Sequence, residues 1–186
     1  MEDSKSTRLD LFDNSDHRPG SLIKRYAWHI INLVFFSSGI HISYGFKRAL
    51  LRLFGSKIGK GVIIKPRVNI KYPWFLEICD YSWIGEGVWI DNIGEVNIGA
   101  NCCLSQGAML LTGNHDFTSS KFDLQVGTIT LEEGVWIGAK SIVCPGVTCH
   151  SHSILSVSSV TSKDLKAYTI YRGNPAIEVS TRTINP

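Results

Sequence analysis

The sequence predicts a mainly β fold, a parallel β-helix of short stacked strands with a helical segment at its N-terminal end. Two observations support this prediction. Apolar side chains recur at every sixth residue, and the residue after the aliphatic is often small or acidic, as in Ile84-Gly85 and Leu131-Glu132. An amphipathic helix repeats about every 3.6 residues and a hairpin sheet about every 2, so neither explains this period. Six residues form one short strand and one turn, and three hexads close a triangular coil.

The hexads extend over most of the chain, with short slips and one long gap. Each coil buries its apolar side chains only against the next coil, so stability accrues by stacking and the end coils need caps. The gap between Leu110 and Leu131 marks an irregular loop over residues 111–128. The repeating apolar positions are Ile58, Ile64, Ile70, Ile78, Ile84, Ile90, Ile98, Leu104, Leu110, Leu131, Ile137, Val143, Cys149 and Leu155.

The segment before the repeat predicts two helices that cap the stack. The first runs from Ser21 to Phe36, and the second runs from Ser43 to Phe54 and stops at Gly55. We therefore divide the chain into a flexible tail over residues 1–20, a helical cap over 21–56 and a β-helix domain over 57–186.

The composition excludes several classes of protein. Of the 186 residues, 44% are hydrophobic and 19% are charged, which is too apolar for a disordered chain. No apolar run approaches the roughly 18 to 20 residues that cross a bilayer, and the N-terminal MEDSKSTRLD is unlike a secretory signal. The five cysteines show no CxxC spacing, which favours reduced thiols in a cytoplasmic protein.

The charge is unevenly distributed. Residues 1–75 hold 13 Lys and Arg against 5 Asp and Glu, whereas residues 76–186 hold 6 against 11. No acid occurs between Asp16 and Glu77, and aromatic side chains are frequent there. Two interpretations follow: peripheral contact of residues 21–75 with the inner face of a membrane or an anionic glycolipid, or a solvated basic rim around capping helices. No recognition motif for nucleic acid accompanies the charge.

The loop in the repeat holds a candidate for chemistry. It reads Gly113-Asn114-His115-Asp116, with a further acid at Asp123. A histidine beside carboxylates can be oriented as a general base near neutral pH. The alternative is a surface histidine in a polar loop.

Several motifs together resemble the hexapeptide-repeat acyltransferases over roughly residues 45–180. They are the hexads, the Gly-Asn-His-Asp loop, VWIG at 135–138, PGV at 145–147 and RGNPA at 172–176. LLRLFGSKIG at 50–59, YPW at 72–74 and YSWIG at 81–85 are similar, more particularly, to acetyltransferases of colanic-acid and exopolysaccharide biosynthesis. The resemblance implies a left-handed parallel β-helix, a homotrimer with active sites between subunits, and acetyl transfer from acetyl-CoA to a sugar hydroxyl.

The resemblance also implies roles for single residues. His115 matches the catalytic base. The usual acceptor-binding asparagine falls near Ile84-Gly85, so other side chains would replace it. The residues expected to bind the acceptor or orient the histidine are Asp91, Asn92, Asn114, Asp116, Asp123 and Trp136, and those expected along the coenzyme tunnel are Trp136, Ala139, Val157, Ser162, Lys163 and Arg172.

Other functions stay open from the sequence. A catalytically silent trimeric β-helix could act as a binding scaffold, and the same histidine chemistry could acetylate the amine of an amino sugar. A zinc-dependent carbonic anhydrase needs a second histidine where Ser120 stands. The pair His150 and His152 could bind a metal weakly, but a surface role is favoured there, and we expect no metal.

Overall fold

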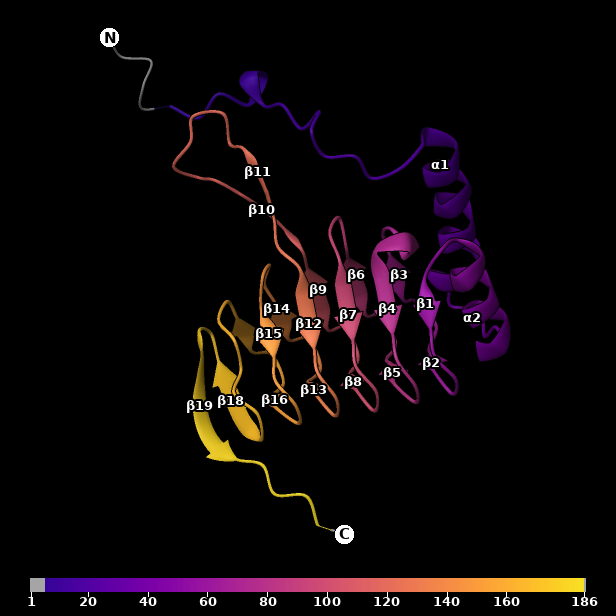
Figure 1. Ribbon diagram of the computed structural model, residues 1–186, viewed down its shortest axis with the longest axis vertical. Coiled ribbons are helices and arrows are strands. Elements are labelled where there is room, and N and C mark those ends of the chain that lie inside the picture. Colours follow the sequence, from indigo (N-terminus) through magenta and orange to yellow (C-terminus); the bar gives the residue numbers. More distant parts are fainter. Residues whose placement is uncertain (1–5, 186) are drawn as a thin grey trace.

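The computed structural model describes residues 6–185 as helices at one end of a long stack of strands (Figure 1). A short turn of 3-10 helix, η2 (Leu9–Leu11), precedes α1 (Leu22–Ile31), which continues into the π-helical turn η3 (Asn32–Phe36). The second helix is α2 (Tyr44–Leu53). Both helices begin as predicted, because the side chains of Ser21 and Ser43 accept the backbone N–H groups of Lys24 and Phe46.

The strands form three parallel sheets, which are the three faces of the solenoid. Face A contains β1 (Lys57–Ile58), β4 (Leu76–Ile78), β7 (Val96–Ile98), β12 (Ile129–Leu131) and β15 (Thr148–Cys149). Face B contains β2 (Ile63–Ile64), β5 (Trp83–Ile84), β8 (Cys103–Leu104), β13 (Trp136–Ile137), β16 (Ile154–Leu155) and β18 (Thr169–Gly173), followed by the antiparallel β19 (Ala176–Thr181). Face C contains β3 (Asn69–Ile70), β6 (Trp89–Asp91), β9 (Met109–Leu111), β14 (Ile142–Val143) and β17 (Val160–Thr161). Each coil takes one strand from each face, which confirms the β-helix predicted from the hexads.

The apolar position of each hexad points into the stack. On face A, Ile58, Ile78, Ile98, Leu131 and Cys149 lie in register in successive coils. All five side chains are buried. The period of six therefore reflects one inward side chain at each strand of the triangle.

The helices close the open end of the stack with hydrogen-bond donors. Along the solenoid, N–H groups of one coil donate to carbonyls of the next, as Gly59 N–H does to Ile78. The carbonyls of the first coil have no preceding coil to bond, so they need other donors. The helices supply them from Trp28 to Ile70 O (2.8 Å), Lys47 to Lys65 O (2.9 Å), Arg48 to Val62 O (2.8 Å) and Arg52 to Ile58 O (2.6 Å).

Stacking also accounts for much of the uneven charge. Lys57 pairs with Glu77 at 3.0 Å, and Arg67 pairs with Glu86 at 3.1 Å. Lys60–Asp80 and Lys71–Asp91 repeat the pattern at 3.8 and 2.9 Å. The first coil is basic and the second acidic, so partners lie about one coil apart in sequence. This arrangement pairs four of the basic residues with acids of the neighbouring coil.

Residues 8–20 of the predicted flexible tail contact the rest of the chain. Arg8 N–H donates to Ser120 O at 2.7 Å, and Nε2 of His17 donates to Ile93 O at 2.8 Å. These contacts hold the segment along the solenoid, where Figure 1 shows it running from α1 to the hairpin β10–β11. Residues 1–5 of the predicted tail lie outside the described residues.

Within residues 6–185, every helix is too short or too polar to span a membrane.

Candidate active site

A hairpin leaves the solenoid where the repeat is interrupted. It is formed by β10 (Gly113–His115) and β11 (Leu124–Val126), which pair antiparallel with His115 opposite Leu124. It stands out from the stack between β9 and β12 (Figure 1). The predicted loop over residues 111–128 is therefore an ordered arm with His115 toward its outer end.

The imidazole of His115 is held by one residue of the hairpin turn. Its Nδ1 lies 2.9 Å from the backbone carbonyl of Phe122, and the Phe122 ring stacks on it at 4.2 Å with an interplanar angle of 10°. Because a carbonyl can only accept, Nδ1 carries the proton and Nε2 keeps a free lone pair. His115 is thus presented as the tautomer that a general base requires.

Phe122, which the sequence does not single out, contacts the imidazole through both its carbonyl and its ring. Its φ of 56° lies in the left-handed region, which non-glycine residues adopt infrequently. This conformation accompanies a turn in which both the carbonyl and the ring of Phe122 face His115. A backbone carbonyl has no residue signature, so the sequence offered no signal for it.

The acids of the loop bond to hydroxyl groups of their own turn. The Asp116 carboxylate accepts from the N–H and the hydroxyl of Thr118 at 2.9 and 2.6 Å, and these bonds hold the pKa of Asp116 below its usual range. The Asp123 carboxylate accepts from the Ser119 hydroxyl at 2.6 Å. These hydrogen bonds fix the turn, and the Phe122 carbonyl orients His115. That Asp116 or Asp123 binds the acceptor or orients the imidazole stays a prediction.

Two neighbouring candidates, Asp91 and Asn92, differ sharply in their surroundings. Asn92 is fully buried; its Oδ1 accepts from the N–H groups of Lys71 and Tyr72, and its Nδ2 donates to Tyr72 O. This burial leaves Asn92 unable to reach a ligand in this conformation, contrary to the predicted acceptor-binding role. Asn114 is exposed, and its Oδ1 accepts from His115 N–H at 2.8 Å.

Asp91 instead lines a cavity of about 570 Å³ between α1 and face C. Its carboxylate lies 2.9 Å from the ammonium group of Lys71. Tyr26, Tyr72 and Trp89 supply aromatic surface to the same cavity. Aromatic walls with a few charged groups suit a sugar ring, whose faces are apolar and whose rim carries hydroxyls.

The predicted coenzyme residues lie in the later coils of the solenoid. Trp136 on β13 is 44% exposed and donates from Nε1 to the Ser105 hydroxyl at 2.9 Å. Ala139 accepts at its carbonyl from Ser158 N–H in the following coil, next to the exposed Val157. The side chains of Ser162, Lys163 and Arg172 are also exposed, at the C-terminal end of the stack.

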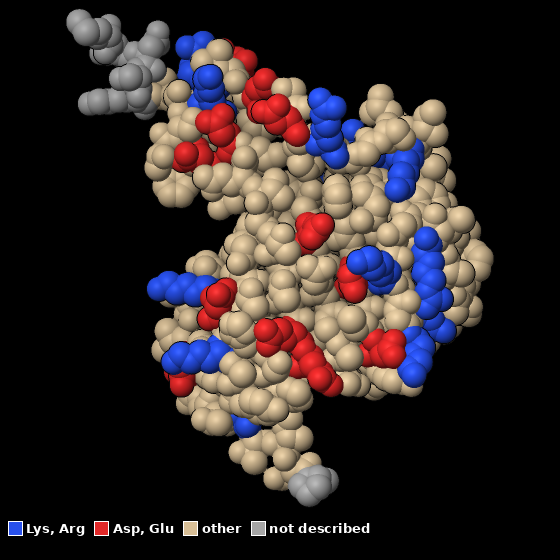
Figure 2. Space-filling model, in the orientation of Figure 1, with Lys and Arg blue, Asp and Glu red and all other residues tan. Residues whose placement is uncertain are grey.

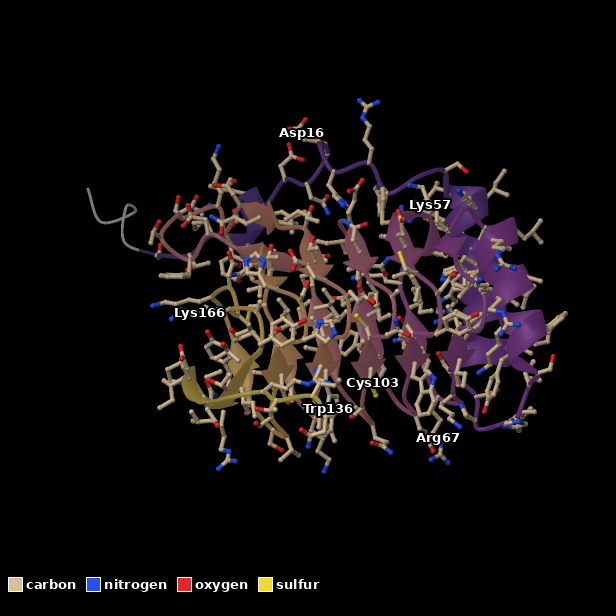
Figure 3. The ribbon with its side chains drawn as sticks, turned by 60° about the horizontal axis from the view of Figure 1, so that its bottom comes forward. Asp16, Lys57, Arg67, Cys103, Trp136 and Lys166 are labelled. Atoms are coloured by element: carbon tan, nitrogen blue, oxygen red, sulfur yellow. The ribbon has the colours of Figure 1, made fainter. Side chains whose placement is uncertain are left out.

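One chain does not bring the hairpin and Trp136 together. In Figure 1 the hairpin lies on the opposite side of the stack from β13 and β16. Figure 3 shows the same separation, with Asp16 of the N-terminal segment on one side and Trp136 and Cys103 on the other. His115 and the face B residues can therefore share a site only if two copies of the chain meet.

The cysteines are unsuited to act as nucleophiles. Burial raises the pKa of Cys102 to about 11 and raises the pKa of Cys149 further still. Burial also raises the pKa of Cys103, which is partly exposed. Thiols in this state stay protonated at neutral pH and react poorly.

The His150–His152 pair does not converge on one point. Nδ1 of His150 lies 3.0 Å from the Glu132 carboxylate, while His152 stacks on Tyr168 at 4.8 Å. In the part of the chain that the structure describes, no three His, Cys, Asp or Glu side chains form a metal-binding group.

No family model matches the chain. It is 38% identical over 165 residues to "Putative colanic acid biosynthesis acetyltransferase WcaF" of Escherichia coli (strain K12), which covers 89% of this chain and 91% of that protein. Two solved structures share the fold. A hexapeptide-repeat acetyltransferase of Vibrio cholerae O1 biovar eltor, complexed with acetyl coenzyme A, has a TM-score of 0.78 at 19% identity, over 87% of this chain and 88% of that one. A maltose O-acetyltransferase of Clostridium difficile 630 has a TM-score of 0.78 at 18% identity, over 88% and 89% of the two chains. The repeat, the arm that carries His115 and the 38% identity to the E. coli protein show that the chain belongs to the hexapeptide-repeat acyltransferases and is an acetyltransferase.

Proposed function

We propose that the protein transfers the acetyl group of acetyl-CoA to a hydroxyl of a sugar used to build a surface polysaccharide. The observation that carries the proposal is the imidazole of His115, with Nδ1 bound to a carbonyl and Nε2 free on a projecting arm. The name of the relative from E. coli, which mentions colanic acid biosynthesis, supports a role of the acetylated sugar in polysaccharide synthesis.

In this reaction the chain supplies a base and a fixed geometry. Acetyl-CoA supplies an activated thioester carbonyl. Nε2 of His115 accepts the proton of the acceptor hydroxyl while that oxygen attacks, and later returns the proton to the leaving sulfur. The Phe122 carbonyl stabilises the charged imidazole through Nδ1–H. Such base catalysis contributes about 10² to 10⁴ in rate, and no cysteine has to react.

We assign a part of the acceptor away from the reacting hydroxyl to the cavity beside α1, because no residue of the hairpin that carries His115 lines this cavity. Asp91 can accept a hydroxyl of the sugar, and Trp89 and Tyr72 can pack against its ring. The product tells an alcohol acceptor from an amine, because hydroxylamine cleaves an acetyl ester and leaves an acetamide intact. An amide product would replace O-acetylation by N-acetylation of an amino sugar.

The coenzyme is assigned to Trp136, Ala139, Val157, Ser162, Lys163 and Arg172. Lys163 and Arg172 are exposed cations that suit its phosphates. We infer further that the arm of one copy meets face B of the next copy in a homotrimer, because one chain keeps the two apart.

Titration with acetyl-CoA tests this assignment. Replacing Lys163 by alanine removes a phosphate partner, so we expect the Kd for acetyl-CoA to rise about tenfold while kcat changes little. Lys166→Ala is the matched control, because Lys166 is already paired with Glu178 at 3.0 Å. Absence of acetyl-CoA binding by the folded wild type would favour the silent scaffold, and an effect of Lys163→Ala on kcat alone would contradict the placement of the coenzyme.

We also propose that the helical cap lies against an anionic membrane surface at its inner face, where it meets a lipid-linked acceptor. A row of exposed apolar side chains follows α1 and η3, and Figure 2 shows Lys and Arg gathered on the side where the helices lie. Apolar side chains flanked by cations are typical of interfacial helices. The exposed row consists of Leu22, Ile23, Tyr26, Ile30, Leu33 and Val34.

Vesicle sedimentation tests this contact. Wild-type protein should bind vesicles that contain phosphatidylglycerol, and Ile23→Asp with Ile30→Asp should lower the bound fraction at least fivefold, because carboxylates oppose both the apolar and the electrostatic contribution. The control is Val179→Asp, an exposed apolar residue of β19 at the other end of the stack. Equal loss in the control would place the contact elsewhere.

A further inference from the structure

Residues 8–20, here called the N-terminal strap, connect the helical cap to the catalytic arm. The strap is bound near the tip of the arm, where Arg8 N–H donates to Ser120 O at 2.7 Å. It is bound again near the base of the arm, where His17 donates to Ile93 O at 2.8 Å. Between these two points it passes over His115.

The contact with His115 is made by Phe12. The Phe12 ring is half-buried, and its centroid lies 5.5 Å from the imidazole with an interplanar angle of 60°. Phe122 stacks on one face of the imidazole at 4.2 Å. The tilted Phe12 ring therefore approaches from another direction, so two aromatic rings restrict the same imidazole.

The arm needs such support. Its two strands have three residues each and pair only with one another. An isolated two-stranded hairpin is marginally stable at best in water. The strap adds the bond from Arg8 N–H to Ser120 O to the hydrogen bonds within the turn. It thereby helps to hold the Phe122 carbonyl that fixes Nδ1 of His115.

We propose that the N-terminal strap positions the catalytic base, with Phe12 as the positioning residue that keeps Nδ1 on the Phe122 carbonyl and Nε2 toward the acceptor. The inference rests on the proposed function in taking His115 as the base. It goes beyond that function by giving residues 8–20 a role in the chemical step. Phe12 is assigned to act through its contact with the His115 ring.

Substitutions at Phe12 separate positioning from folding. Phe12→Ala should lower kcat roughly three- to tenfold, which matches the usual worth of an aromatic pair, and should leave the KM for acetyl-CoA and the Tm unchanged. Phe12→Tyr keeps the ring and should restore most of kcat. The control is Leu11→Ala, a change at the exposed neighbouring residue, which should behave as wild type. Removal of residues 2–19 should lower kcat at least as much as Phe12→Ala.

A second readout needs no acetyl transfer. In the proton NMR spectrum, His115 signals are those that disappear in His115→Gln, and ring currents from Phe12 should shift them. Phe12→Ala should move these signals and leave those of His150 in place. Unmoved His115 signals, or a kcat equal to wild type after strap removal, would overturn the proposal. If Phe12→Ala lowers the Tm as well as kcat, Phe12 has a structural role and the positioning role is wrong. If Phe12→Ala moves the His115 signals but the wild-type protein has no acetyltransferase activity, the contact between the strap and His115 is supported and the proposed function is wrong.

Discussion

Replacing His115 by alanine is expected to lower kcat by about 10² to 10⁴ while the Tm and the Kd for acetyl-CoA stay unchanged. The reason is that Nε2 is the free atom of an imidazole whose other nitrogen is fixed to the Phe122 carbonyl at 2.9 Å. The side chain lies on an arm outside the stack, so its loss leaves the core intact. Release of coenzyme A thiol, followed with a chromogenic disulfide, measures the change.

His150→Ala is the control for a general effect of losing a histidine, since His150 lies on the surface beside Glu132. Near-normal turnover of His115→Ala would exclude His115 as the base. Mixed oligomers extend the same experiment. If the arm of one copy acts with face B of the next, inactive His115→Ala and Trp136→Ala subunits should regain part of the activity when they assemble together. Activity that stays lost in the mixture would contradict a site shared between two copies.

The fold is predictable from the sequence because its cause is local and repeated. Each hexad places one apolar side chain inward, as Ile84 and Leu104 do in adjacent coils. The helical cap is equally local, because the serine N-caps and the glycine at φ 101° after α2 act on neighbouring residues. His115 could be found for the same reason, since the interruption of a regular repeat is visible in a single sequence.

The surroundings of His115 could not be predicted, because they depend on contacts distant in sequence or made by the backbone. Phe12 lies more than one hundred residues before His115, and Phe122 acts through a carbonyl that every residue possesses. The partners of the acids were equally hidden, since Asp116 and Asp123 are the conspicuous polar neighbours of His115 and yet bond to hydroxyls of their own turn. The ion pairs between coils were hidden in the same way, because a coil that looks unbalanced along the chain pairs with the coil stacked on it.

The small residue after each inward side chain predicts that a larger residue there lowers the stability of the solenoid strongly. A Cβ on Gly138 would lie 2.6 Å from Val157 N and 2.7 Å from Leu155 O, which are backbone atoms of the next coil. Because these atoms belong to the ladder, in which Gly138 N–H donates to Leu155 O at 2.7 Å, they can yield only if β13 and β16 separate. Gly138→Ala should therefore lower the free energy of unfolding by about 2 to 3 kcal/mol, as overpacking a closely packed interior does. Urea denaturation measures it.

Gly45→Ala gives the opposite sign in the same protein. Gly45 is exposed in α2, and a Cβ there meets only the end of the Arg48 side chain at 3.9 Å, so the helix should gain about 0.5 kcal/mol. The difference between the two variants isolates coil spacing from the general effect of adding a methyl group.

Gly138 also precedes Ala139, and the obstructed atom belongs to Val157, two of the residues assigned to the coenzyme. Separation of these coils should thus weaken acetyl-CoA binding even where Gly138→Ala is fully folded. A variant as stable as wild type would mean that the coils can part at no cost, and the small residue of each hexad would then need another explanation than contact between coils.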